Sequence, residues 1–189
     1  MIFFSLFSRL GFSNTYLIGP DNGGDGVLVD PGVFDAALLD AVEKNGLYIR
    51  SILITHAHNA HINGIRSLLK VYDAEIYANQ PSVLDFPAHR VKDGDVLSIG
   101  GFSVRVIETP GHSIDSLCFE VGHVVFTGDT LSAGGTGATR DGYARGLLLE
   151  SVRRKLLSLA DEVLLFPGHG PPTKVGVEKL YNPLLGEKL

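Results

Sequence analysis

The chain has 189 residues, with 16 basic and 21 acidic side chains, 44% hydrophobic residues and one cysteine. This length is typical of one domain, and the ordinary share of apolar residues excludes an intrinsically disordered chain. The net charge of −5 argues against nucleic-acid and anionic-membrane binding, because both need a basic surface. The lone Cys118 excludes an intramolecular disulfide and favours a reducing cytoplasm. We therefore expect a single cytoplasmic domain over residues 1–189.

The first ten residues, MIFFSLFSRL, are apolar enough to be compared with a targeting segment. A signal peptide carries its positive charge before the apolar run, whereas here Arg9 follows it. No apolar run reaches the ~18 residues of a membrane span. The segment is predicted to be an opening strand.

Short apolar runs bounded by glycine predict strands, and apolar residues three to four positions apart predict helices. The first half predicts strands at 15–18, 27–29, 52–54 and 74–78, with helices at 34–42 and 62–69. The second half predicts strands at 96–99, 102–107, 116–121, 124–126 and 163–166, with a helix at 146–159 whose basic run 153–155 faces outward. Strands and helices that alternate with hairpins favour an α/β (α+β) fold with sheets packed face to face under helices.

Three histidines, His56, His58 and His61, fall within six residues directly after the predicted strand at 52–54. Side chains at the end of a buried strand are held rigidly and face a cleft. Imidazole is the commonest protein ligand for zinc and other first-row metals. Two rings two residues apart can bind one ion, and the third ring can bind a second ion.

Three later loops repeat this arrangement, because each places a ligand-type side chain just after an apolar strand. They carry His112, Asp129 and His169. We therefore expect a metal cleft formed by four loops. His89 and His123 lie outside this pattern, and we expect them to be ordinary structural or surface residues.

These motifs together resemble the metallo-β-lactamase superfamily, and within it the short glyoxalase II-like (hydroxyacylglutathione hydrolase-like) hydrolases. The resemblance covers almost the whole chain and implies a four-layer αββα sandwich with a metal cleft along one edge. It implies one metal site formed by His56, His58 and His112, and a second formed by His61 and His169. Asp129 is expected to bridge the two sites.

The chain departs from the family pattern at Ala60, where the first loop usually has an aspartate that ligates the second metal. Its loss predicts a second site with less charge and fewer ligands. Two smaller departures are Asp115, often a glycine in the family, and the Gly137–Arg140 stretch, which lacks the usual Gly-Arg-x-Asp.

The chemistry implied is metal-assisted hydrolysis of a small thioester or ester by a metal-bound hydroxide, impaired by Ala60. Asp129, His61 and His169 are the residues expected to carry catalysis. Zinc suits imidazole-rich sites, while Fe²⁺ and Mn²⁺ are also compatible with these ligands. Cys118 lies within a predicted strand and is expected to be a core residue.

Two alternatives remain open. His56, His112 and Asp129 could form the facial triad of a mononuclear non-haem iron persulfide dioxygenase. The chain could also be an inactive homologue that binds metal or ligand without turnover.

The substrate is the least defined part of the prediction. Longer glyoxalase II enzymes hold glutathione with an added helical domain that this sequence does not contain. Arg140, Tyr143 and Lys174, with Arg145 and Tyr181, are candidates for a substitute anion site, although each is individually typical of an ordinary surface residue.

Overall fold

The structure is a computed structural model that describes residues 1–9 and 11–185. One sheet contains, in spatial order, β1 (Ile2–Ser8), β2 (Ser13–Gly19), β3 (Gly24–Val29), β4 (Leu47–Leu53), β5 (Glu75–Ala78) and β8 (His89–Arg90). The other contains β14 (Thr173–Lys174), β13 (Leu164–Pro167), β12 (Val124–Gly128), β11 (Leu117–Val121), β10 (Phe102–Glu108) and β9 (Val96–Ile99). A separate ribbon pairs β6 (Ser82–Val83) with β7 (Phe86–Pro87).

Both six-stranded sheets of the described chain are mixed. In the first, β1 and β2 are antiparallel while β3 and β4 are parallel. In the second, β10 and β11 are antiparallel while β12 and β13 are parallel. The helices are α1 (Ala36–Lys44), α2 (Asn59–Ile62), α3 (Ile65–Leu68), α4 (Gly142–Ser151) with the π-helical turn Val152–Leu156, and α5 (Val175–Tyr181).

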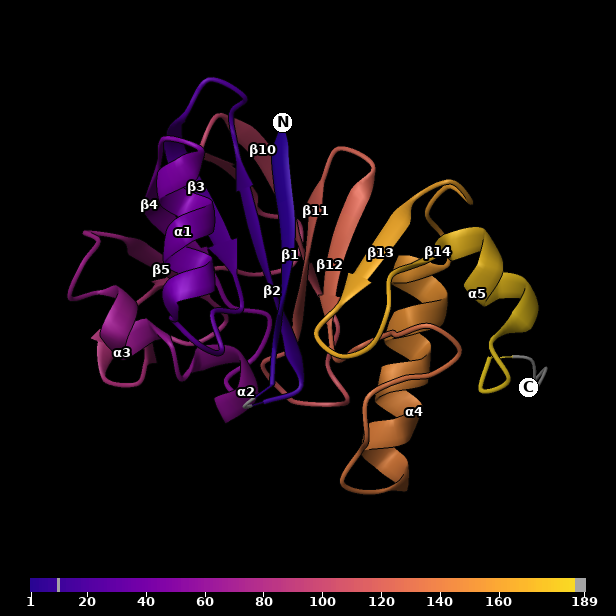
Figure 1. The fold of residues 1–189 in the computed structure, drawn as a ribbon. Coiled ribbons are helices and arrows are strands. Elements are labelled where there is room, and N and C mark those ends of the chain that lie inside the picture. The colour runs from indigo at the N-terminus through magenta and orange to yellow at the C-terminus, as the bar shows by residue number, and fades with distance from the viewer. Residues whose placement is uncertain (10, 186–189) are drawn as a thin grey trace.

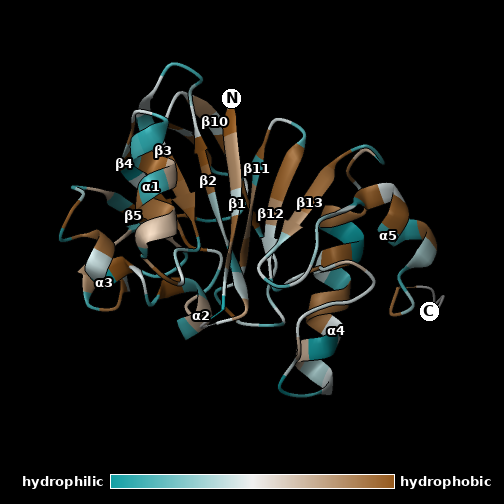
Figure 2. Ribbon diagram, in the orientation of Figure 1, coloured by the Kyte–Doolittle hydropathy of each residue, from teal (hydrophilic) through white to brown (hydrophobic). Residues whose placement is uncertain are grey.

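The buried apolar residues form three clusters, as an αββα sandwich requires. Figure 1 shows the sheets and the helices between which these clusters lie. The central layer lies between the sheets and includes Phe119 and Phe126. One outer layer packs α1 on the first sheet, and the other packs α4 on the second sheet around Leu148. Figure 2 shows the hydrophobic residues concentrated in the strands and hydrophilic stretches on the helices. The predicted fold is confirmed, and Cys118 is fully buried in the second outer layer, as expected.

Two predicted helices differ from those observed. The helix predicted at 62–69 is divided into α2 and α3, because the Gly64 amide donates to the Pro31 carbonyl at 2.9 Å and not to a carbonyl of the preceding turn. The helix predicted at 146–159 begins earlier, where the Asp141 side chain caps the Ala144 amide at 2.9 Å. It ends in a π-turn, and Lys155 turns back to Asp93 at 2.9 Å instead of facing outward.

No helix within 1–9 and 11–185 is long and apolar enough to cross a membrane.

Candidate metal centre

Four loops that follow strands meet at one edge of the sandwich, the lower edge in Figure 1. The loop after β4 carries His56, His58 and His61, and the loop after β10 carries His112. Asp129 follows β12, and His169 follows β13. The two sheets are joined here, because the Leu117 amide donates to the Thr55 carbonyl at 2.7 Å. Short connections from buried strands therefore bring all six predicted ligand side chains together.

The first cluster contains His56, His58, His112 and Asp129, whose ligand atoms lie within 4.8 Å of one another. The Nδ1 atom of His58 lies 3.0 Å from His56 Nε2 and 3.1 Å from His112 Nε2. Nitrogens bound tetrahedrally to one zinc ion at ~2.05 Å are separated by about 3.3 Å. The three rings are thus spaced like ligands of a single ion.

The second cluster contains His61, Asp129 and His169. The Oδ1 atom of Asp129 lies 3.6 Å from His61 Nε2 and 2.8 Å from His169 Nδ1. The other oxygen, Oδ2, faces the first cluster at 3.5 Å from His112 Nε2. Asp129 therefore presents one oxygen to each cluster, which is the arrangement expected of a bridging carboxylate.

A second group of side chains and carbonyls fixes which nitrogen of each ring faces the clusters. The His112 Nδ1–H donates to the Ala138 carbonyl at 2.7 Å, leaving Nε2 as the lone-pair nitrogen. The Asp30 carboxylate lies 3.0 Å from His61 Nδ1 and also accepts the Thr55 hydroxyl proton at 2.6 Å. Since that hydroxyl directs its one hydrogen at Asp30, it accepts a hydrogen bond from His56 Nδ1 at 3.1 Å. Each of these rings turns Nε2 toward the cluster.

The donor set fits a metal. In the described part of the chain, His61 Nε2 is the one buried side-chain nitrogen or oxygen with no hydrogen-bond partner. An unsatisfied buried nitrogen costs free energy unless something outside the protein chain binds it. Three imidazoles and one carboxylate around one point, beside a second group of three ligands, are also the donors that zinc or iron prefers.

Ala60 occupies the second position of α2 and is half-buried. Its backbone is tightly held, since Ser13 Oγ donates to its carbonyl at 2.7 Å. A side-chain carbon at Gly32 would lie 1.9 Å from the same carbonyl oxygen. Asn59 is exposed on the preceding position. The second cluster therefore contains one carboxylate, Asp129, among the described residues.

The packing of charged groups shifts the histidine pKa values in opposite directions. Burial, together with the neighbouring His61, lowers the pKa of His56 to about 3. Burial also opposes protonation of His61, but Asp30 and Asp129 outweigh it and raise its pKa to about 10. In Asp129 the hydrogen bond from His169 and the nearby His61 imidazole outweigh burial and hold the pKa of the carboxyl well below its usual range. The metal-free site therefore holds a proton on His61.

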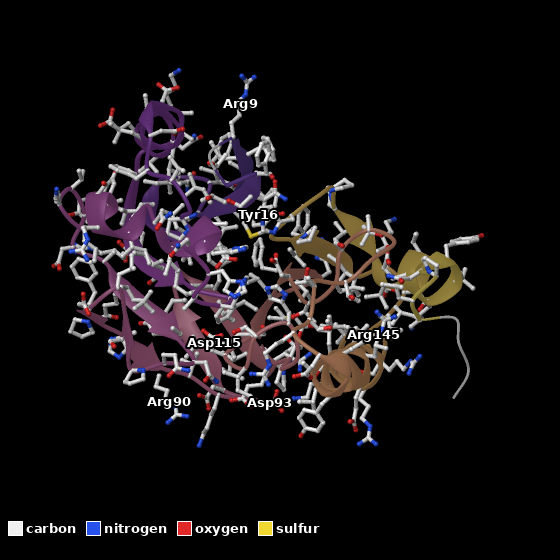
Figure 3. All side chains as sticks on the ribbon, turned by 90° about the horizontal axis from the view of Figure 1, so that it is seen from below. Arg9, Tyr16, Arg90, Asp93, Asp115 and Arg145 are labelled. Atoms are coloured by element: carbon white, nitrogen blue, oxygen red, sulfur yellow. The ribbon has the colours of Figure 1, made fainter. Side chains whose placement is uncertain are left out.

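Two acidic residues support the site without having been predicted to do so. Asp30 is 1% exposed and connects Thr55 with His61, although in the sequence it is part of an ordinary Asp-Pro-Gly turn. Asp115 is also buried, accepts the Ala57 amide at 3.0 Å and is hydrogen-bonded to Ser113. Figure 3 shows Asp115 near the middle of the molecule, where it joins the first histidine loop to the His112 loop.

A groove of about 320 Å³ adjoins His112. Arg140 and Tyr143 line it together with the apolar side chains of Ile114 and Leu147. Arg145, Lys174 and Tyr181 are not among its lining residues as the structure describes it. Arg145 lies on α4 (Figure 3), while Lys174 belongs to β14 and Tyr181 ends α5.

His89 and His123 lie elsewhere. His89 is exposed, stacks on Tyr77 and lies 3.6 Å from Glu75. His123 is exposed in the turn between β11 and β12. Neither belongs to a metal-type cluster among residues 1–9 and 11–185.

An αββα sandwich with two adjoining ligand clusters at one edge defines a class of proteins that hold metal ions where two sheets meet. The chain belongs to the metallo-beta-lactamase superfamily, whose sequence pattern matches residues 8–169. The resemblance inferred from the sequence is thus confirmed.

Individual relatives agree with this assignment. The chain is 30% identical over 195 residues to hydroxyacylglutathione hydrolase GloC of Haemophilus influenzae, covering 89% of this chain and 91% of that protein. Its structure is similar to the crystal structure of ETHE1 from Myxococcus xanthus, with a TM-score of 0.89 and 32% identity over 100% of this chain and 86% of that one. It is also similar to TTHA1623 in a di-iron-bound form, with a TM-score of 0.82 and 31% identity over 96% and 100% of the two chains.

Proposed function

We propose that the chain is a metal-dependent thioesterase of the glyoxalase II-like type, which hydrolyses a small thioester or ester. The observation that carries the proposal is Asp129, which directs its two oxygens to two separate ligand clusters. That arrangement supports a pair of ions at a fixed separation. The similarity to a hydroxyacylglutathione hydrolase supports a thioester substrate.

His56, His58 and His112 would hold one ion, and His61 and His169 would hold the other, with Asp129 shared. Two such ions, when bound, lower the pKa of a water molecule toward neutrality and polarise a carbonyl group. The chain's own contribution is to position the ligands. Thr55, Asp30 and Ala138 orient three of the rings, and Asp129 keeps the clusters at one spacing.

The second site is proposed to bind its ion more weakly than the first, because it has three protein ligands, including the shared carboxylate, whereas the first has four. Zinc is the ion we propose, on the chemistry of the imidazole-rich donor set. The di-iron form of TTHA1623 supports iron as the other candidate.

The groove beside His112 is proposed to bind part of the substrate. Its exposed apolar residues, Ile114 and Tyr143, would contact an apolar segment, and Arg140 would pair with an anionic group. A substrate bound in this groove would lie beside His112, and its reactive carbonyl could therefore reach the first cluster.

The experiment that tests the function begins with metal analysis of protein purified without chelator. We expect zinc in the first site, partial occupancy of the second, and hydrolysis of a hydroxyacylglutathione thioester that increases when zinc is added. No turnover in a broad thioester and ester screen, both with added zinc and after Ala60→Asp, would contradict the proposal. It would favour a homologue that binds without catalysis.

An iron-dependent persulfide dioxygenase is the second candidate, supported by the similarity to the ETHE1 fold. The position of His58 favours the hydrolase, because it adds a fourth ligand to the His56, His112 and Asp129 set. A facial triad has three protein ligands and leaves the other positions open. Oxygen uptake with glutathione persulfide separates the two candidates, since a thioesterase consumes no oxygen.

A further inference from the structure

A buried carboxylate on α5 belongs to none of the ligand clusters. Glu178 is 1% exposed and accepts hydrogen bonds from the Gly134 amide at 3.1 Å, the Thr173 hydroxyl at 2.7 Å and the Asn182 amide at 2.7 Å. All these donors, in the part of the chain that the structure describes, are neutral. Burying a carboxylate without a cation costs free energy, so its hydrogen bonds must hold it in place.

Glu178 is hydrogen-bonded to the turn at Gly134 and Gly135. Asn182, which is 4% exposed, connects Glu178 to the Gly135 carbonyl at 3.4 Å. Ser132 and Gly135 close the turn on itself through two backbone hydrogen bonds of 3.0 and 3.1 Å. One end of this turn is therefore fixed to α5.

The other end of the same segment is fixed to the metal edge. The Gly137 amide donates to the Asp129 carbonyl at 2.9 Å, and the Ala138 carbonyl accepts the Nδ1 proton of His112 at 2.7 Å. Gly137 itself is closely surrounded, because a side-chain carbon there would lie 2.1 Å from the Asp129 carbonyl oxygen. It would also lie 2.7 Å from His112 Nδ1.

We propose that Glu178 is a positioning residue for the first cluster. Through the turn at 132–138 it keeps the Ala138 carbonyl on His112, and so keeps His112 Nε2 directed at His58 and Asp129. The inference rests on the metal centre of the proposed function but not on hydrolysis. A chain that binds metal without turnover would leave it intact.

The test is Glu178→Gln, which preserves the side chain's shape. The glutamine amide turns N–H groups toward donors that need an acceptor, so the turn loses at least one hydrogen bond. We expect zinc affinity at the tighter site, measured by competition with a chromophoric chelator, to fall by up to about 10-fold, the lower end of the effect of removing a direct outer partner of a ligand, because Glu178 acts through the intervening segment. Glu162→Gln, at an exposed acid close to β13, is the matched control and leaves the affinity unchanged.

A readout on the ring itself separates positioning from plain stability. In chelator-treated wild-type protein, nitrogen NMR should find His112 as the Nδ1–H tautomer, and Glu178→Gln should lower the population of that tautomer. Wild-type zinc affinity and an unchanged His112 tautomer in the variant, with only a lower melting temperature, would show that Glu178 merely stabilises α5. A wild-type protein whose His112 is not the Nδ1–H tautomer would overturn the proposal as well.

A second variant keeps the proposal testable if Glu178→Gln does not fold. Asn182→Ala removes one of the donors to Glu178 and the contact with Gly135, but leaves the carboxylate on the Gly134 amide. We expect a smaller loss of zinc affinity in the same direction. Unchanged affinity in this folded variant would count against the proposal.

Discussion

The side chain at position 60 determines how much negative charge faces the second cluster. Ala60 lies directly before His61 on α2, and its backbone is fixed by Ser13, so a carboxylate introduced there starts from a defined position. We expect Ala60→Asp to raise zinc occupancy of the second site. Thioester turnover should rise by on the order of 10²–10⁴, the usual contribution of a positioned general base.

Asn59→Asp is the control for Ala60→Asp, because it adds the same charge one residue away on an exposed position. Metal content by elemental analysis and turnover should change in Ala60→Asp alone. An equal rise in both variants would attribute the effect to overall charge and not to ligation.

Asp30 shows how a supporting residue acts through its neighbours. It accepts hydrogen bonds from the Thr55 amide at 2.8 Å and the Thr55 hydroxyl at 2.6 Å, and it faces His61 Nδ1 at 3.0 Å. Asp30→Asn removes the charge that favours Nδ1–H on His61, and asparagine tolerates the positive φ of 51°. We expect zinc affinity at the second site to fall by about 10–100-fold.

The matched control for Asp30→Asn is Asp85→Asn, which makes the same substitution at an exposed residue that also has a positive φ, of 69°. It should bind zinc as the wild type does in the same competition titration. Wild-type affinity in Asp30→Asn would mean that the backbone, and not the carboxylate, orients His61.

The role of Asp30 could not be predicted from the sequence, because its partners Thr55 and His61 are 25 and 31 residues away. The candidate ligands could be picked out from the sequence, since they follow apolar strands by one to eight residues, and their role in binding metal stays a prediction. The sequence shows Asp30 only as part of an Asp-Pro-Gly turn. Its contact with His61 is tertiary and forms only in the folded chain.

At the scale of elements, α4 packs closely over the His112 loop. Gly111 has a φ of 141°, and a side-chain carbon there would lie 2.4 Å from the Leu148 amide nitrogen on α4. Gly111→Ala must therefore move the loop or the helix. We expect a loss of about 1–3 kcal/mol in the free energy of unfolding, measured in urea, together with weaker zinc binding through His112.

Gly146→Ala supplies the comparison, because Gly146 lies within α4 and a side-chain carbon there meets no atom within 4 Å among the described residues. Alanine in an open helical position should raise the free energy of unfolding by about 0.4–1 kcal/mol. If Gly111→Ala were as stable as the wild type, the close approach of α4 would not restrain the His112 loop.

Most elements could be predicted because their apolar residues recur at the period of a strand or helix. The differences arise where tertiary contacts override that pattern. The helical run is interrupted at Gly64, whose amide donates to the Pro31 carbonyl, and α4 begins at Gly142, four residues before the predicted start, after the capping Asp141. The helix α5 was not predicted, because Val175 and Glu178 are the buried residues of a short, otherwise exposed segment, and a buried glutamate has no apolar signature.

At the scale of the whole molecule, the metal edge brings five histidines around one shared carboxylate, Asp129. The free energy of unfolding of the metal-free protein should therefore depend on pH. The unfolded chain titrates His56 and His61 near 6.5, whereas the folded, metal-free protein gives them pKa values of about 3 and about 10. The lowered pKa of His56 affects stability below pH 6.5, and the raised pKa of His61 affects stability above it. Metal-free protein should therefore be most stable near pH 6.5.

Below pH 6.5 the unfolded chain binds a proton at His56 that the folded protein does not bind, so the free energy of unfolding falls as the pH drops toward 3, by about 1.4 kcal/mol per pH unit. His58, whose pKa is lowered by burial and by His112, acts in the same direction. Above pH 6.5 the folded protein keeps a proton on His61 that the unfolded chain has lost, so stability falls as the pH rises toward 10. His169, whose pKa is raised by its hydrogen bond to Asp129, adds to this decline.

Urea unfolding of chelator-treated protein between pH 5 and pH 9 measures how the free energy of unfolding falls on the acid side (the acid limb) and on the alkaline side (the alkaline limb). One variant tests each limb. His56→Asn should flatten the acid limb, and His61→Asn should flatten the alkaline limb. Saturating zinc should also abolish the alkaline decline, because ligation requires neutral imidazole and metal affinity therefore rises with pH. A metal-free protein that grows steadily more stable from pH 6.5 to 9 would show that His61 is not charged between Asp30 and Asp129.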